Sequence, residues 1–131
     1  MTRITPFLMF DGHAEAAMNF YASIFRNAEI ASIARSDAGG PGAEGSIYHG
    51  VMTICGQRLM FFDSPVKHGF TFTPSISMFV DCDTEAELDE AYRGLEQGGQ
   101  VMMPLGAYPF SRKFGWVADK FGVSWQLNLP G

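Results

Sequence analysis

Amide and hydroxyl side chains alternate with large apolar ones near the carboxyl end of this 131-residue chain. Successive side chains of a β-strand point to opposite faces of its sheet, so Ser124, Gln126 and Asn128 are predicted to share one face. Trp125 and Leu127 fall on the other face, where they would pack against a helix. The polar face could orient a small ligand, or its groups could simply satisfy one another in a filled interior.

The three histidines, His13, His49 and His68, have no partner at the spacing of a metal site. His49 lies in a predicted strand and, if its hairpin pairs regularly, points to the face opposite the helix, where it could act as an acid or a base. No carboxylate is predicted beside it. We therefore interpret His49 as a structural or ligand-contacting group, expect the other two histidines in solvent, and assign no catalytic residue.

The composition excludes several classes of protein. With 47% hydrophobic and 18% charged residues the chain is ordinary globular material, expected to form a single domain over residues 1–131. A net charge of −5 leaves no basic stripe for nucleic acid or for an anionic membrane. The apolar run before Asp11 is broken by Pro6 and is too short for a signal core or a membrane span, so we expect a cytoplasmic protein. Cys55 and Cys82 are expected to be reduced, buried thiols inside strands.

The elements that must position these side chains occur twice along the chain. In the first half, an apolar strand leads to a helix with one apolar stripe, a second strand, a glycine-rich mobile loop and a hairpin that turns at Gly56. The predicted bounds are 4–10 for the first strand, 14–27 for the helix, 30–34 for the second strand, 37–45 for the loop and 47–63 for the hairpin.

The second half restarts this plan after a connector. Thr84 and Glu87 form a capping box at the start of its helix. The last hairpin turns just after Asp119, and Gly122 supplies the positive φ that a tight turn needs. The predicted bounds are 64–72 for the connector, 75–80 for the first strand, 84–97 for the helix, 101–105 for the second strand and 113–129 for the hairpin.

This order predicts an α+β fold made of tandem βαβββ repeats, about 1–64 and 72–131. Each repeat alone would leave one face of its sheet bare, so the two repeats are expected to pair and bury that face.

The chain resembles the vicinal oxygen chelate superfamily, the glyoxalase and bleomycin-resistance proteins, and within it the PhnB-like family, often labelled "3-demethylubiquinone-9 3-methyltransferase". The resemblance covers nearly the whole chain and is most specific in its final hairpin. The stretches that carry it are 4–8, 15–21, 56–60, 101–105 and 114–127. It implies a curved mixed sheet in each half, with one helix on the outer face and a cup on the inner one.

In enzymes of that superfamily the cup holds a divalent metal. The positions that would supply its ligands are, by the resemblance, Pro6, Met60, Ser75 and Gln126. Proline has no ligating side chain, methionine is a soft ligand and serine a poor one, so only Gln126 suits the site. We therefore expect no metal and no cofactor.

The resemblance and strand alternation together predict the residues that line the cup. Methionine and phenylalanine with a few amides and hydroxyls suit a small, partly apolar ligand. Neither reasoning assigns Trp116 to a face. Tyr108, Arg112 and Lys113 are placed on a loop that could gate the cup or bind an anionic group. The cup-lining candidates are His49, Met60, Phe62, Ser75, Ser77, Gln126 and Asn128.

Two functions are consistent with this reading. The first is a metal-free binding protein of the bleomycin-resistance kind, a homodimer as the superfamily's members commonly are, that holds a small molecule in the cup. The second is an enzyme, an isomerase, lyase or transferase, that works through Gln126, His49 or a metal brought by its ligand. Methyl transfer from S-adenosylmethionine is not expected, because the glycine-rich stretch 37–45 leads into a strand rather than a helix.

Overall fold

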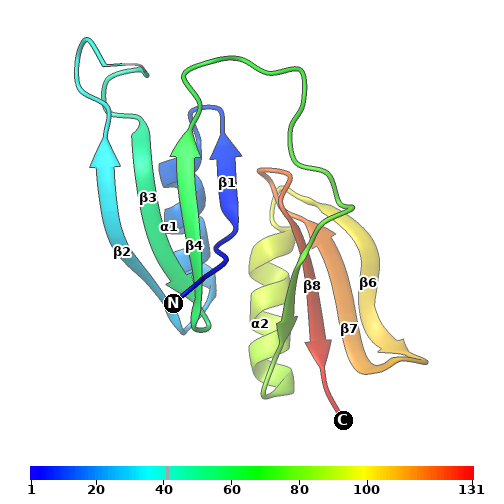
Figure 1. Ribbon diagram of the computed structural model, residues 1–131. Coiled ribbons are helices and arrows are strands. Elements are labelled where there is room, and N and C mark those ends of the chain that lie inside the picture. The colour runs from blue at the N-terminus through cyan, green and yellow to red at the C-terminus, as the bar shows by residue number, and fades with distance from the viewer. Residues whose placement is uncertain (41) are drawn as a thin grey trace. The chain divides into compact units, whose positions relative to one another are not determined.

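The computed structural model describes residues 1–40 and 42–131, which form two compact units, Met1–Gly69 and Phe70–Gly131. Each unit contains one helix and one four-stranded sheet, and each helix lies along its own sheet (Figure 1). No helix in the described part of the chain is long and apolar enough to span a membrane.

In the first unit the strand order is β1-β4-β3-β2. β1 runs parallel to β4, whereas β2 and β4 both run antiparallel to β3, so the sheet is mixed. The elements are β1 (Phe7–Phe10), α1 (Ala14–Ile24), β2 (Ala28–Arg35), β3 (Ile47–Ile54) and β4 (Gln57–Asp63).

The second unit has the same plan, with strand order β5-β8-β7-β6 and one parallel pair, β5 with β8. Its elements are β5 (Met78–Asp81), α2 (Glu85–Glu96), β6 (Gln100–Tyr108), β7 (Ser111–Ala118) and β8 (Ser124–Leu129). The predicted tandem of βαβββ modules is confirmed.

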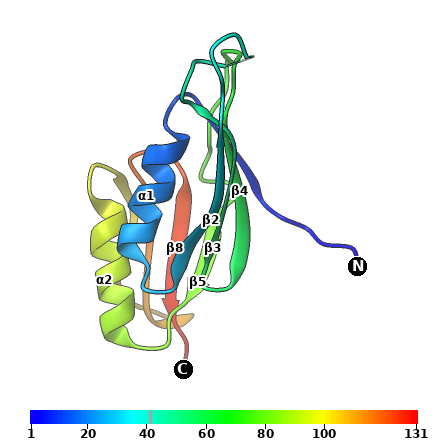
Figure 2. The same ribbon diagram turned by 90° about the vertical axis from the view of Figure 1, so that its left-hand side faces the viewer.

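Helix α1 lies along one face of its sheet (Figure 2). It packs through the predicted stripe, in which Ala14, Ala17, Met18 and Tyr21 are fully buried. Its first turn is held by Asp63 at the end of β4. One carboxylate oxygen of Asp63 accepts from the backbone N–H of Ala14 at 2.9 Å, and the other accepts from that of Ile47 at 3.0 Å. A single buried acid thus ties the start of the helix to two strands, because exposed N–H groups at a helix start need acceptors.

Helix α2 begins with the predicted capping box. Thr84 Oγ1 accepts from the backbone N–H of Glu87 at 3.2 Å, and the Glu87 carboxylate accepts in return from the backbone N–H of Asp83 at 3.0 Å. The predicted stripe is buried, and the chain leaves the helix at Gly98, which has a φ of +72°. The stripe consists of Leu88, Ala91, Tyr92 and Leu95.

Each core lies between one helix and one sheet. Met52, Leu59 and Phe61 face α1, and Val117, Trp125 and Leu127 face α2, all with an exposure of 2% or less. Full burial of a large apolar side chain contributes about 1.5–3 kcal/mol, so these side chains supply most of the stabilisation of each unit.

Several helices and strands begin or end at other residues than predicted. β1 begins at Phe7 rather than residue 4, since Pro6 has no N–H to pair. β5 begins at Met78 rather than residue 75, because Pro74 and the residue after it form a turn. Helix α1 ends at Ile24 rather than 27, because Phe25 adopts an extended ψ of 129°. The loop predicted at 37–45 contains no helix or strand among its described residues, and residue 41 lies outside them.

The prediction that both cysteines lie inside strands was wrong, and the predicted burial holds for Cys82 but not for Cys55. Cys82 is buried, as expected, but it follows β5 rather than lying inside a strand. Cys55 is exposed and occupies the turn between β3 and β4 with a φ of +51°. The tight turn ahead of Gly56 requires this left-handed conformation, which carries the side chain out of the sheet.

Candidate functional site

The face of the second sheet that α2 does not cover, called here the open face of the second unit, carries a row of three paired residues. Gln126 pairs with Phe79 on β5 and with Trp116 on β7. Residues directly opposite each other on neighbouring strands point to the same face. Trp116, which the sequence left unassigned, therefore shares the open face with Gln126.

A hydrogen-bonded network connects the polar groups of this face. Gln126 Nε2 donates to Ser77 Oγ at 3.1 Å, and the Ser77 and Ser124 hydroxyls lie 2.6 Å apart. Trp116 Nε1 donates to Ser124 Oγ at 2.8 Å. Ser124 is 2% exposed, whereas the other three are half-buried, so the network runs from the interior of the sheet to its surface.

Asn128 occupies the next row and is held by two neighbours. Its Nδ2 donates to Asp81 Oδ1 at 2.8 Å, and its Oδ1 accepts from the Ser111 hydroxyl. Both polar ends of this amide are therefore engaged within the protein. The row brings one carboxylate, that of Asp81, to the edge of the open face.

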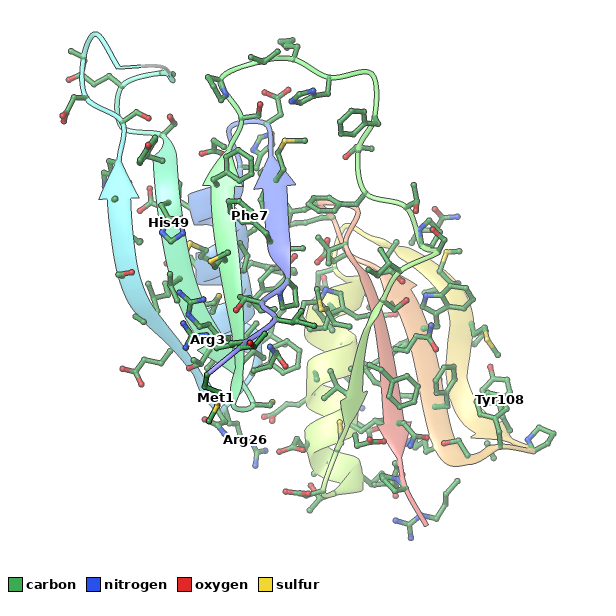
Figure 3. All side chains as sticks on the ribbon, viewed as in Figure 1. Met1, Arg3, Phe7, Arg26, His49 and Tyr108 are labelled. Carbon is green, nitrogen blue, oxygen red and sulfur yellow. The ribbon has the colours of Figure 1, made fainter. Side chains whose placement is uncertain are left out.

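Aromatic side chains cover the remainder of the open face. The ring of Phe114 is buried, and its centroid lies 5.0 Å from that of Phe110, 5.9 Å from that of Tyr108 and 6.3 Å from that of Phe79. Phe79 is 57% exposed and Phe110 65% exposed. Tyr108 lies at the end of β6 beside the β6–β7 turn (Figure 3), and its hydroxyl donates to the Pro104 carbonyl at 2.6 Å.

The open face of the first unit is different. Its equivalent row consists of Phe7, Met60 and Val51, all apolar. The Phe7 ring lies 4.7 Å from that of Phe62 and 6.2 Å from that of His49, and Figure 3 shows Phe7 and His49 on the side of the sheet away from α1. Within the described residues no ion pair joins His49 to an acid, so no oriented acid–base pair forms there.

The four positions suggested for a metal offer few ligand atoms. Ser75 is exposed ahead of β5, and its hydroxyl bonds to that of Thr73 at 2.7 Å. Pro6 offers only its carbonyl, which accepts from the backbone N–H of Met60 at 2.9 Å. The described residues contain no group of three or more His, Cys, Asp or Glu side chains suited to a metal ion. These residues do not fit a divalent cation, which prefers several oxygen or nitrogen ligands.

The charged residues predicted on a loop lie instead on strand β7. The Lys113 ammonium contacts Asp89 Oδ1 at 2.8 Å and Glu85 Oε2 at 2.7 Å, both on α2. The hydrogen bonds to Asp89 and, next, to Glu85 hold the pKa of Lys113 above its ordinary value. A cavity of about 240 Å³ beside this cluster is lined by Glu85, Arg112, Lys113 and Leu129, none of which belongs to the Gln126 row.

The sequence alone did not assign Trp116 to the candidate site. The face that its side chain occupies depends on how the turn before β8 pairs β7 with β8. The turn separates paired residues Ala118 and Ser124, and Asp119 fixes its shape. Asp119 Oδ1 accepts from the backbone N–H groups of Phe121 at 2.9 Å and Val123 at 3.1 Å. An acid at the start of such a turn was the signal that could have set the register.

Comparison with known proteins agrees with this fold. A structure titled as a glyoxylase/bleomycin resistance protein/dioxygenase domain from Frankia superposes with a TM-score of 0.70 at 12% identity, covering 100% of this chain and 99% of its own. At that identity the likeness concerns the fold alone, which is that of the glyoxalase and bleomycin-resistance proteins.

The family follows from closer matches. The family model described as 3-demethylubiquinone-9 3-methyltransferase matches residues 2–128, and the chain belongs to this PhnB-like family. A PhnB protein from Bacillus cereus is 56% identical, with a TM-score of 0.94 and coverage of 98% of this chain and 99% of its own. Protein PA1353 from Pseudomonas aeruginosa is 26% identical, with a TM-score of 0.87 and coverage of 99% and 98%.

Proposed function

We propose that the protein binds a small, partly apolar molecule on the open face of its second unit, without a resident metal. The observation that carries this proposal is the polar network of Gln126, Ser77, Ser124 and Trp116 set among exposed aromatic rings. A few oriented polar groups within an apolar surface are typical of ligand sites. All four groups of the network are neutral, which favours an uncharged ligand.

Binding accounts for the site better than catalysis does. An acid–base enzyme needs a titratable group held by a second group and aimed at the substrate. His49, the histidine on the open face of the first unit, packs against Phe7, and within the described residues no ion pair joins it to an acid. The network of the second unit contains no group that titrates near neutral pH.

The methyltransferase wording of the family description calls for its own test. A nucleoside cofactor of that kind binds where a glycine-rich turn joins a parallel strand to a helix. The stretch 37–45 instead joins β2 to the antiparallel strand β3. We expect no heat of binding when S-adenosylmethionine is titrated into the protein by calorimetry, and saturable binding at one site per chain would contradict the proposal.

Native mass spectrometry of the full chain, purified without added ligand, tests the proposed function. We expect an organic adduct on the wild type and its loss from Gln126→Ala. Gln57→Ala is the matched control, because Gln57 is an exposed glutamine of the first unit that bonds only to the neighbouring Arg58 carbonyl. An adduct retained by Gln126→Ala, or a mass that corresponds to one bound metal ion, would overturn the proposal.

We further propose that the protein acts as a homodimer, as is common in its superfamily. Sedimentation equilibrium at micromolar concentration should give twice the mass of the chain. A monomer that still carries the adduct would reject the dimer while leaving ligand binding intact.

A further inference from the structure

Counting donors and acceptors shows which group donates to which in the network of the second unit. The Ser124 hydroxyl already accepts from Trp116 Nε1, and at 2% exposure its own proton needs an acceptor inside the protein. Among the described residues the acceptor within hydrogen-bond distance is Ser77 Oγ, at 2.6 Å. Ser124 therefore donates to Ser77.

The same count leaves three groups that can bond outward from the network. Ser77 Oγ accepts from Ser124 and also from Gln126 Nε2, so both lone pairs of Ser77 Oγ are used. The Ser77 proton must then be donated away from the network. No described residue donates to Gln126 Oε1, and both side chains are half-buried rather than enclosed. Gln126 Nε2 also keeps its second N–H, so the network ends in the Ser77 hydroxyl donor and in an amide that offers both an acceptor and a donor.

The flanking side chains suit a flat molecule. Phe79 and Trp116 pair with Gln126 from either side, so their rings stand in the same row with the amide between them. Neighbouring strands lie about 4.8 Å apart, which places the two rings roughly two strand spacings from each other. An aromatic ring that entered between them would meet the Gln126 amide with its edge.

The charges beside this network favour a neutral ligand over an anion. The carboxylate of Asp81 lies one row away, held by Asn128, and no cationic side chain belongs to the network. A ligand carboxylate or phosphate would lose its water there without gaining a counter-ion, which is costly. A neutral ligand meets no such cost.

We propose that the ligand of this face is a neutral aromatic lactam, whose C=O accepts from the Ser77 hydroxyl while its neighbouring N–H donates to Gln126 Oε1. A lactam presents an acceptor and a donor side by side in the plane of its ring, which complements the outward hydroxyl of Ser77 and the outward oxygen of Gln126. This inference rests on the proposed function and specifies the chemical class of molecule bound at that site.

The test is a titration of the ¹⁵N-labelled full chain with 2-quinolone, followed by NMR. The indole N–H signal of Trp116 and the side-chain amide signals of Gln126 should shift and saturate. N-Methyl-2-quinolone keeps the ring and the carbonyl but lacks the donor, and we expect it to bind about tenfold more weakly. Quinoline-2-carboxylate, which carries a charge, should produce no saturable shift.

Two variants test whether the binding of 2-quinolone depends on Ser77. Ser77→Ala removes the hydroxyl that donates outward and should weaken 2-quinolone binding about tenfold. Ser75→Ala is the control, because Ser75 is exposed and bonds only to Thr73. Since the comparison of the two quinolones leaves the protein unchanged, it stands even if Ser77→Ala disturbs the fold.

Equal affinity for 2-quinolone and its N-methyl derivative, or tighter binding of the carboxylate, would overturn the lactam assignment. If an organic molecule co-purifies through Gln126 but the quinolones cause no shift, the proposed function holds and the lactam inference fails. If no molecule co-purifies and no quinolone binds, both are contradicted.

Discussion

Trp116 on β7 donates its indole N–H to the hydroxyl of Ser124 on β8, at 2.8 Å. The bond joins a half-buried ring of the open face to a serine sealed inside the sheet. The second tryptophan, Trp125, points to the opposite face and donates to Asp119 Oδ2 at 2.9 Å. The two indoles of one hairpin therefore serve different purposes, one at the candidate site and one in the core.

This difference predicts a ranking for two identical substitutions. Trp116→Phe removes one bond between neutral groups and should lower the free energy of unfolding by about 1 kcal/mol. Trp125→Phe removes a bond to a buried carboxylate and opens space in the core, so it should cost about 3 kcal/mol. Urea unfolding followed by circular dichroism measures both. A larger loss for Trp116→Phe would show that the core has been assigned to the wrong face.

The turn before β8 depends on a single carboxylate. Asp119 is 4% exposed and accepts from two backbone N–H groups and from Trp125. Asp119→Ala removes these three hydrogen bonds and should lower the free energy of unfolding by about 3 kcal/mol, measured by urea titration. Asp11→Ala, at an exposed acid, should change it by less than about 0.5 kcal/mol. Equal effects would refute the role given to Asp119.

Helix α2 approaches its sheet closely at one glycine. A Cβ on Gly115 would lie 2.5 Å from Cε2 of Tyr92, whereas one on Gly106 would meet nothing within 4 Å. Gly115→Ala should therefore lower the melting temperature and cost about 1–3 kcal/mol, while Gly106→Ala should be close to neutral. Tyr92→Leu combined with Gly115→Ala should recover part of the loss, because the clash is removed. Additive losses in that double variant would argue against the contact.

The Lys113 cluster predicts an alkaline dependence of stability. Because Asp89 and Glu85 raise the pKa of Lys113 above 10.5, the cluster stabilises the fold fully below that pH. The contribution is lost as the pH rises through the elevated pKa. Lys113→Met should thus lower the melting temperature at pH 8, and the difference from wild type should shrink as the pH rises through the elevated pKa of Lys113. A difference that grows with pH would contradict the sign of the effect.

The duplication was predictable because local signals are strong at both ends of each unit. The capping box of Thr84 and the hairpin glycines at 56 and 122 fix where elements begin and turn. The same residues place Gln126 opposite the helix by simple alternation. The face that a candidate side chain occupies was therefore predictable wherever a strand could be counted from a well-marked turn.

The rest of the candidate site depended on the register between paired strands, which the propensities of single residues do not determine. Trp116 could not be assigned until the pairing of Ala118 with Ser124 was known. Ser75 was expected in the cup, but the turn at Pro74 leaves it exposed ahead of β5. The aromatic cluster around Phe114 brings together β5, β6, β7 and a turn, which no single stretch of sequence reveals.

X-ray diffraction from crystals of the protein purified without added ligand tests the central claim most directly. We predict electron density for a small organic molecule against Gln126 and Trp116 on the open face of the second unit. Density for a metal ion coordinated by Gln126, or for a ligand held only by the first unit beside His49, would contradict the account.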